Sequence, residues 1–258
     1  MTEGVVKLNI LQFSLIYLLL IIVLIVMKRS RIQQSKLLLW ASLRMTVQLV
    51  LAGWLLTYIF QHQHWAFTAV YLVAMLVFAV VRVLSKVKHL NHRFKWIISL
   101  SFVFAGMFVL CYFVLAVVGK SLFNPQYTIP LAGMILGNAM TGVNLGLKTF
   151  CDSVKDRRNE IETLLNLGVH PREILLPFAN SALETALLPT LNTMLGMGII
   201  YLPGMMTGQI LSGTLPTTAI MYQIAIMVAI CASVALTTFS ALHFGSQTLF
   251  NSNLQLND

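Results

Sequence analysis

Two ionisable side chains stand inside long apolar runs of this sequence. Arg44 lies in the run 37–60 and Glu184 in the run 178–201. A charge inside such a run is costly in lipid and usually has a function or a partner. Arg44 lies seven residues past Leu37 and Glu184 seven past Pro177, so a rise of about 1.5 Å per residue puts each about 10 Å deep. An Arg44–Glu184 ion pair that joins two spans is one reading. A carboxylate that faces a cavity and meets a cationic substrate is the other.

Methionine and glutamine side chains gather near the far end of the run that holds Glu184. Thioethers suit soft or borderline metals, although methionine also fills irregular cores without any metal. The histidine pairs His62/His64 and His89/His92 are weaker metal candidates on polar loops, and the identity of any metal is unknown. The candidates for a transport pathway are Glu184, Met197, Met205, Met206 and Gln209.

No catalytic or ATP-binding motif accompanies these residues. The only Gly-Lys-Ser, at 119–121, has Val114 where a phosphate-binding loop needs its first glycine, and it lies between apolar runs rather than between a strand and a helix. The three cysteines are scattered without metal-ligand spacing. We therefore expect a chain that is not an enzyme and carries no cofactor of its own.

Composition assigns the chain to the membrane proteins. Hydrophobic residues make up 58% and charged residues 10% of the 258 residues, and the mean hydropathy is +0.82, which no soluble domain of this size could hide. A helical span needs about 20 apolar residues. On that measure we predict an all-α, polytopic membrane protein that forms a single domain over 1–258. Its seven predicted spans are 10–27, 37–60, 65–81, 96–118, 128–147, 178–201 and 217–241.

The net charge of +9 comes from basic residues whose positions follow the pattern of a multi-span membrane protein. Basic residues cluster in alternate connections between the predicted spans, and by the positive-inside rule these connections face the cytoplasm. The N-terminus is then outside and the C-terminus cytoplasmic. This basicity attracts anionic membrane lipids, and it indicates no nucleic-acid partner.

Two segments contain unusual glycine patterns. In the fifth span Gly133 and Gly137 are four residues apart, as are Gly142 and Gly146, a spacing that lets helix backbones approach closely in lipid. This predicts a position at the bundle centre or at an interface between protomers. The segment 203–216 is glycine-rich and apolar, and we expect a re-entrant or a plain interfacial helix there.

The charged segment 148–177 predicts a helix-turn-helix between the fifth and sixth spans. Gly168 would end its first helix and Pro171 would begin the second. The segment is too small to be a catalytic domain, and its size suits a handle that another protein grips.

This segment resembles the coupling loop of ABC transporter permeases. In import permeases that loop runs Glu-Ala-Ala, three residues, Gly, nine residues and then Ile-x-Leu-Pro. Glu162 and Gly168 keep the first spacing, and Ile174, Leu176 and Pro177 reproduce the last motif. The departures are Thr163 and Leu164 in place of the alanines, and five residues instead of nine before Ile174.

Three further stretches, LRMTVQLVLAGWLL, GMILGNAMTGVNLGL and LPGMMTGQILSGTLPTTAIMYQI, look like the FetB family of iron-export ABC permeases, whose plant relatives are linked to aluminium tolerance. The resemblance runs nearly end to end. It implies iron export across a bacterial inner membrane by two permeases and two separate cytoplasmic ATPase subunits, which bind the ATP and Mg. The coupling candidates are then Glu160, Glu162, Gly168, Pro171 and Arg172.

Other function classes stay open at this point. An ABC permease for a peptide or a lipid would keep the same architecture. A secondary metal transporter would use Glu184 as its proton-carrying carboxylate. A third class is a lipid-binding or signalling membrane subunit without transport.

Overall fold

The computed structural model describes residues 9–62, 64–87 and 90–249, and the regular elements in these ranges are helices. A π-helical turn, η1 (Phe113–Val117), continues α4. The helices are α1 (Ile10–Arg29), α2 (Ser35–Gln61), α3 (Trp65–Leu84), α4 (His92–Tyr112), α5 (Pro125–Asp156), α6 (Arg158–Asn166), α7 (Pro171–Gly196), α8 (Gly204–Leu211) and α9 (Pro216–Ser246). The predicted all-α class is confirmed.

Six helices in the described ranges are long and apolar enough to cross a membrane, namely α1, α2, α3, α4 with η1, α7 and α9. The fifth predicted span corresponds to α5, which is less apolar than these six and does not meet the same threshold. Its 32 residues are nevertheless long enough to cross. Other helices cover much of α5, which buries thirteen of its residues.

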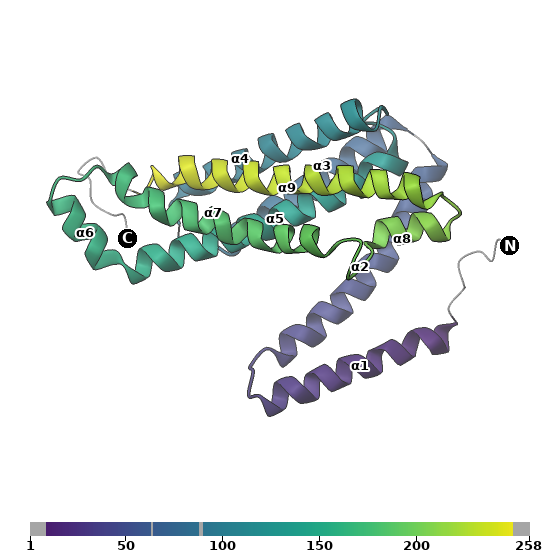
Figure 1. Ribbon diagram of the computed structural model, residues 1–258. Helices are drawn as coiled ribbons and strands as arrows, with labels where there is room; N and C mark the ends of the chain where they lie inside the picture. The colour runs from purple at the N-terminus through teal and green to yellow at the C-terminus, as the bar shows by residue number, and fades with distance from the viewer. Residues whose placement is uncertain (1–8, 63, 88–89, 250–258) are drawn as a thin grey trace.

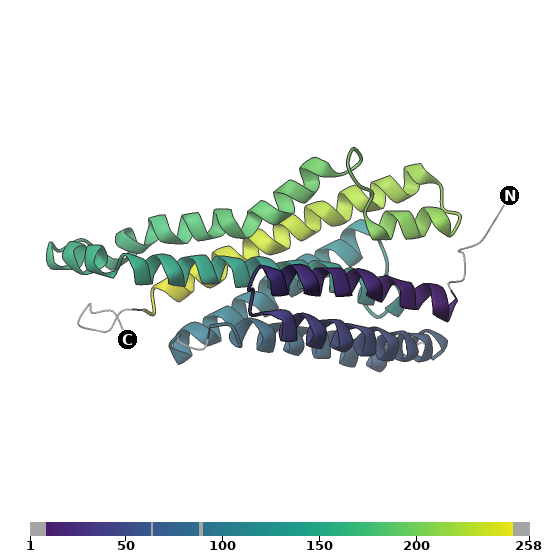
Figure 2. The same cartoon turned by 90° about the horizontal axis from the view of Figure 1, so that it is seen from below.

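The helices form an elongated bundle, with α6 at one end and α8 at the other (Figure 1). The start of α1 lies toward the α8 end, whereas α9 finishes toward the α6 end, which suits an odd number of crossings when α5 is counted (Figures 1 and 2). The α1–α2 hairpin stands away from the other helices, and the side chains of α1 are exposed along almost its whole length.

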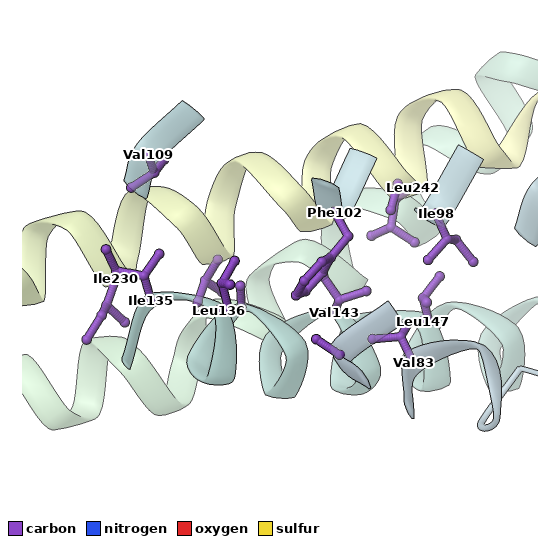
Figure 3. Packing of buried hydrophobic residues seen from close by; sticks show 14 of the residues in the cluster. Val83, Ile98, Phe102, Val109, Ile135, Leu136, Val143, Leu147, Ile230 and Leu242 are labelled. Atoms are coloured by element: carbon purple, nitrogen blue, oxygen red, sulfur yellow. The ribbon is translucent and has the colours of Figure 1, made fainter. Parts of the chain in front are cut away.

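The hydrophobic core lies where α3, α4, α5, α7 and α9 meet. Phe102 of α4, Val143 of α5 and Leu242 of α9 belong to one cluster of buried side chains, and Figure 3 shows them close together. In lipid there is little hydrophobic drive between helices, so such packing must come from close contact. The second glycine pair of α5 provides it.

Gly142 and Gly146 lie at the closest approach of α5 to its neighbours. A Cβ at Gly146 would lie 2.9 Å from Cγ2 of Thr238 on α9 and 3.2 Å from the carbonyl oxygen of Ala182 on α7. The first pair differs, because a Cβ at Gly137 would meet no atom within 4 Å. The position of α5 at the bundle centre is thus confirmed, and only the second glycine pair supports it.

Helix ends differ from the prediction around the sixth span and its flanks. α7 begins at Pro171 rather than at 178 and ends at Gly196 rather than at 201. The predicted helix-turn-helix is therefore not a separate unit: α5 continues to Asp156, α6 follows, and the second helix is the first turns of α7. Within 203–216 a short helix, α8, forms and packs against α9.

The packing of α4 on α9 yields a stability prediction. Gly245 of α9 faces the ring of Phe94, a fully buried residue of α4, and a Cβ there would overlap the ring. We expect Gly245→Ala to lower the free energy of unfolding by about 2 kcal/mol, since the ring has no room to move away. Thermal unfolding of the purified protein in detergent measures this.

Gly53→Ala is the matched control, because a Cβ at Gly53 of α2 meets no atom within 4 Å. It should leave the melting temperature unchanged or raise it slightly. Equal melting temperatures for the two variants would contradict the α4–α9 packing.

Candidate functional site

Polar side chains are exposed in the middle of both α5 and α7. α9 covers Gly142 and Gly146 of α5 and packs beside Ala179 and Leu183 of α7. The exposed polar residues lie on the helix faces that α9 leaves free. We call this set the polar face; its members are Asn138, Thr141, Ser181 and Glu184.

Glu184 lies near the centre of α7 and is exposed on the protomer surface. Ala182 and Ala186, two residues before and after it, contact the glycine pair of α5. This register places Glu184 level with the polar part of α5, and its side chain points away from α5, because residues two apart on a helix point to nearly opposite sides. An exposed carboxylate at this depth needs water, a cation or a second protein surface, because lipid cannot solvate it.

The predicted ion pair between Arg44 and Glu184 is wrong for this structure. Both residues are described, and no ion pair joins them. The guanidinium of Arg44 lies instead over the ring of Phe78, 5.8 Å from its centroid, a cation–π contact that keeps Arg44 on the α2–α3 side. Equal depth in the membrane was a necessary condition for the pair. The direction in which each helix face points decided the outcome.

Asn138, Thr141 and Asn144 are functional candidates that sequence reasoning missed. Asn138 Nδ2 donates to the carbonyl of Met134 at 2.8 Å, and Thr141 Oγ1 donates to that of Gly137 at 3.1 Å. Their remaining acceptor oxygens are free to face a ligand. Asn144 Oδ1 is buried and has no hydrogen-bond partner. The signal was present in the sequence as polar residues three apart, which form one row along a helix.

The predicted methionine and glutamine candidates lie at the α8 end, and one of them, Met197, contacts a residue that was not predicted, Gln223 of α9. Gln223 is 5% exposed, and its Nε2 lies 4.0 Å from Sδ of Met197, just past the end of α7. The Oε1 atoms of Gln223 and of Gln209 on α8 are both buried without a hydrogen-bond partner. Met206 is buried on α8, and Met205 is partly buried against the core.

This methionine–glutamine cluster offers neutral sulfur and oxygen donors. Such donors suit a soft or borderline cation that has shed part of its water, and unsatisfied buried amide oxygens would gain a partner from it. Glu184 is not part of the cluster. Thirteen residues separate it from Met197, about 20 Å along the chain at helical rise. The structure thus divides the predicted pathway residues into two places.

Other metal-binding side chains have local roles. His64 Nδ1 accepts from the backbone of Ala66 at 3.2 Å and caps α3, and His62 stacks on Tyr58. His89 lies outside the described residues. Burial and the neighbouring Asp152 raise the pKa of Cys151 to about 11, so this thiol stays protonated at neutral pH. Among the described residues, no three His, Cys, Asp or Glu side chains group as metal ligands.

The α6 end holds the residues predicted for coupling. Arg157 pairs with Glu160 at 3.8 Å and Arg158 Nε with Glu162 at 2.8 Å, and all four side chains are exposed. Such surface pairs stiffen a short helix and contribute little to stability. The buried side chain of Ile161 anchors α6 to the bundle.

The turn between α6 and α7 forms as the sequence predicted. Gly168 has a φ of +83°, which favours glycine, and Pro171 is the first residue of α7. His170 caps α7 by accepting the backbone N–H of Arg172. An open cavity of about 300 Å³ lies beside this turn, between α5, α6 and α7, with Arg157, Glu160 and Glu173 on its rim.

Comparison with known proteins places this architecture in a family. The chain is 34% identical over 224 residues to the UPF0014 membrane protein slr1647 of Synechocystis, with 85% of each chain covered. It is 28% identical over 245 residues to the probable iron export permease protein FetB of Escherichia coli, covering 95% of this chain and 93% of that one.

A plant protein is also similar. Protein ALUMINUM SENSITIVE 3 of Arabidopsis thaliana is 32% identical over 213 residues, which cover 83% of this chain and 77% of that one. No solved structure matches the chain. Residues 10–250 match a single family, and the chain therefore belongs to the uncharacterised protein family UPF0014.

Proposed function

We propose that this chain is the permease subunit of an ATP-driven exporter that moves iron, or a related metal ion, out of a bacterial cytoplasm across the inner membrane. Two copies would act with two cytoplasmic ATPase subunits, which supply the ATP and Mg. The α6 end would face the cytoplasm, in keeping with the basic connections at that end, and the α8 end would face outward.

The polar face carries this proposal. Asn138, Thr141 and Glu184 are exposed on the surface of a single protomer, at a depth where lipid would otherwise meet them. A second copy that packs against the exposed faces of α5 and α7 would enclose these polar groups, and the same arrangement would explain why Gly137 has open space around it. A passage with a carboxylate at its centre favours cations.

The assignment of iron as the cargo is based on the relative from Escherichia coli, and the assignment of ATP as the energy source is based on the position of α6. The relative from Escherichia coli is named a probable iron export permease. In this chain, α6 lies at the end of the bundle and is joined to α7 by the short turn at Gly168 and Pro171. A push on α6 would then be transmitted along α7 to Glu184, and farther along to Met197.

Iron accumulation in inverted membrane vesicles tests the function. Vesicles that contain this chain and its partner ATPase should accumulate iron when ATP is present and not when it is absent. Accumulation that persists without ATP and collapses with the proton gradient would instead indicate a secondary transporter. Absence of iron flux from complexes that hydrolyse ATP would assign a different cargo, such as a peptide or a lipid.

Glu184→Gln tests the central carboxylate. We expect ATP-dependent iron flux to fall about tenfold, as a loss of about 1.4 kcal/mol in cation stabilisation would give. Glu184→Asp keeps the charge and should retain most of the flux. Asp156→Asn removes an exposed carboxylate at the end of α5 and is the matched control. If Glu184→Gln and Asp156→Asn had the same flux, Glu184 would lie outside the passage.

Gly168→Arg tests coupling at the α6 end. An arginine cannot hold a φ of +83° without strain, so the turn should change direction and flux should fall to background while the chain stays inserted. Gly168→Asn is the control, because asparagine tolerates this conformation. Full ATP-driven flux in Gly168→Arg, measured in the same vesicles, would remove the coupling role from this turn.

A further inference from the structure

An arginine and a histidine lie together at the α6 end, where the first turn of α7 meets the last turn of α9. Arg172 Nη2 lies 3.1 Å from Nε2 of His243 on α9. The imidazole of His243 stacks on Phe239, with ring centroids 5.1 Å apart. Within the described part of the chain, neither Arg172 nor His243 forms an ion pair with a carboxylate. The two side chains are thus hydrogen-bonded to each other, and the remaining N–H groups of the Arg172 guanidinium have no carboxylate partner.

The surrounding hollow is polar at one end and apolar along its length. Arg172 and His243 lie where α7 begins and where α9 finishes. Deeper in the bundle the walls become aliphatic and aromatic, with the amide of Asn180 as the polar exception. The lining residues are Arg172, Leu176, Ala179, Asn180, Leu183, Phe239, Leu242, His243 and Ser246.

This gradient runs along the bundle axis, as it does in a phospholipid. The side chains of Leu176 and Phe239 are each 48% exposed, so an acyl chain in the surrounding bilayer can reach them. A guanidinium makes two parallel hydrogen bonds to a phosphate, a geometry that an ammonium does not match. Basic pockets between helices at the membrane surface bind the headgroups of anionic lipids.

We propose that the surface over the hollow between α7 and α9 binds an anionic phospholipid, whose phosphate accepts from the remaining N–H groups of Arg172 beside His243 and whose acyl chain lies along the exposed side chains of Leu176 and Phe239. The bound lipid would join the first turn of α7 to the end of α9. Since α7 also continues from α6, the lipid would hold the base of the helix that carries Glu184.

Lipid binding to the purified full-length chain tests this directly, without the ATPase or any cargo. Native mass spectrometry with phosphatidylglycerol and phosphatidylcholine supplied together should show preferential retention of phosphatidylglycerol. Arg172→Gln should reduce that preference about fivefold, the effect expected for one arginine at an anionic surface. Arg172→Lys should restore only part of it.

Arg82→Gln is the matched control, because Arg82 is exposed in the last turn of α3 and is not among the residues that line the hollow. It should keep the wild-type preference. Equal losses in Arg82→Gln and Arg172→Gln would mean general attraction to a basic surface and would overturn the site. An unchanged preference in Arg172→Gln would also overturn it and would leave Arg172 free for an acidic surface of the ATPase.

Inorganic phosphate separates a lipid from a free anion. Excess phosphate should not displace phosphatidylglycerol, because the apolar walls contribute to binding, and Phe239→Ala should weaken lipid retention while the protein keeps its melting temperature. Displacement by phosphate would overturn the lipid assignment. Because these measurements need neither ATP nor iron, their failure would leave the proposed transport function untouched.

Discussion

The close approach of α5 to α7 and α9 is the constraint on which the arrangement depends. Gly142 and Gly146 have no side chains, so the carbonyl oxygens of Ala182 and Ala186 come into van der Waals range of α5. Where lipid supplies no hydrophobic drive between helices, this contact sets which residues lie level with one another. It sets Glu184 level with the polar row of α5 but on the far side of α7, because residues two apart on a helix point to nearly opposite sides.

Along the bundle the structure divides three kinds of chemistry. At the α6 end, exposed charges pair within one short helix and are screened by solvent. They stabilise the fold little, but they stiffen α6 and give another protein a charged surface to recognise. In the middle, a single carboxylate and several amide and hydroxyl groups face outward. The α8 end contains thioethers and two buried amide oxygens that lack hydrogen-bond partners. A cation on this route would meet a charged group and then neutral donors, and weak neutral donors favour release.

The two errors in the predicted site have one physical origin. The depth of Arg44 and of Glu184 follows from counting residues, but whether they meet depends on the rotation of each helix about its axis and on which helices are neighbours. Arg44 instead makes a cation–π contact with the ring of Phe78 on α3. Gln223 was missed for the same reason, because a single glutamine in an apolar run is conspicuous only when Met197 and α8 are folded against it.

The amino-acid sequence by itself determined the class of protein, the approximate spans and the turn at Gly168 and Pro171, because hydropathy, glycine conformation and proline geometry act over a few neighbouring residues. It also determined that α5 would pack closely, through the spacing of its glycines. Only the tertiary structure decided which faces remain exposed, that Arg44 and Glu184 stay apart, and that Arg172 lies beside His243. These outcomes depend on contacts between segments far apart in the chain, and no local pattern specifies them.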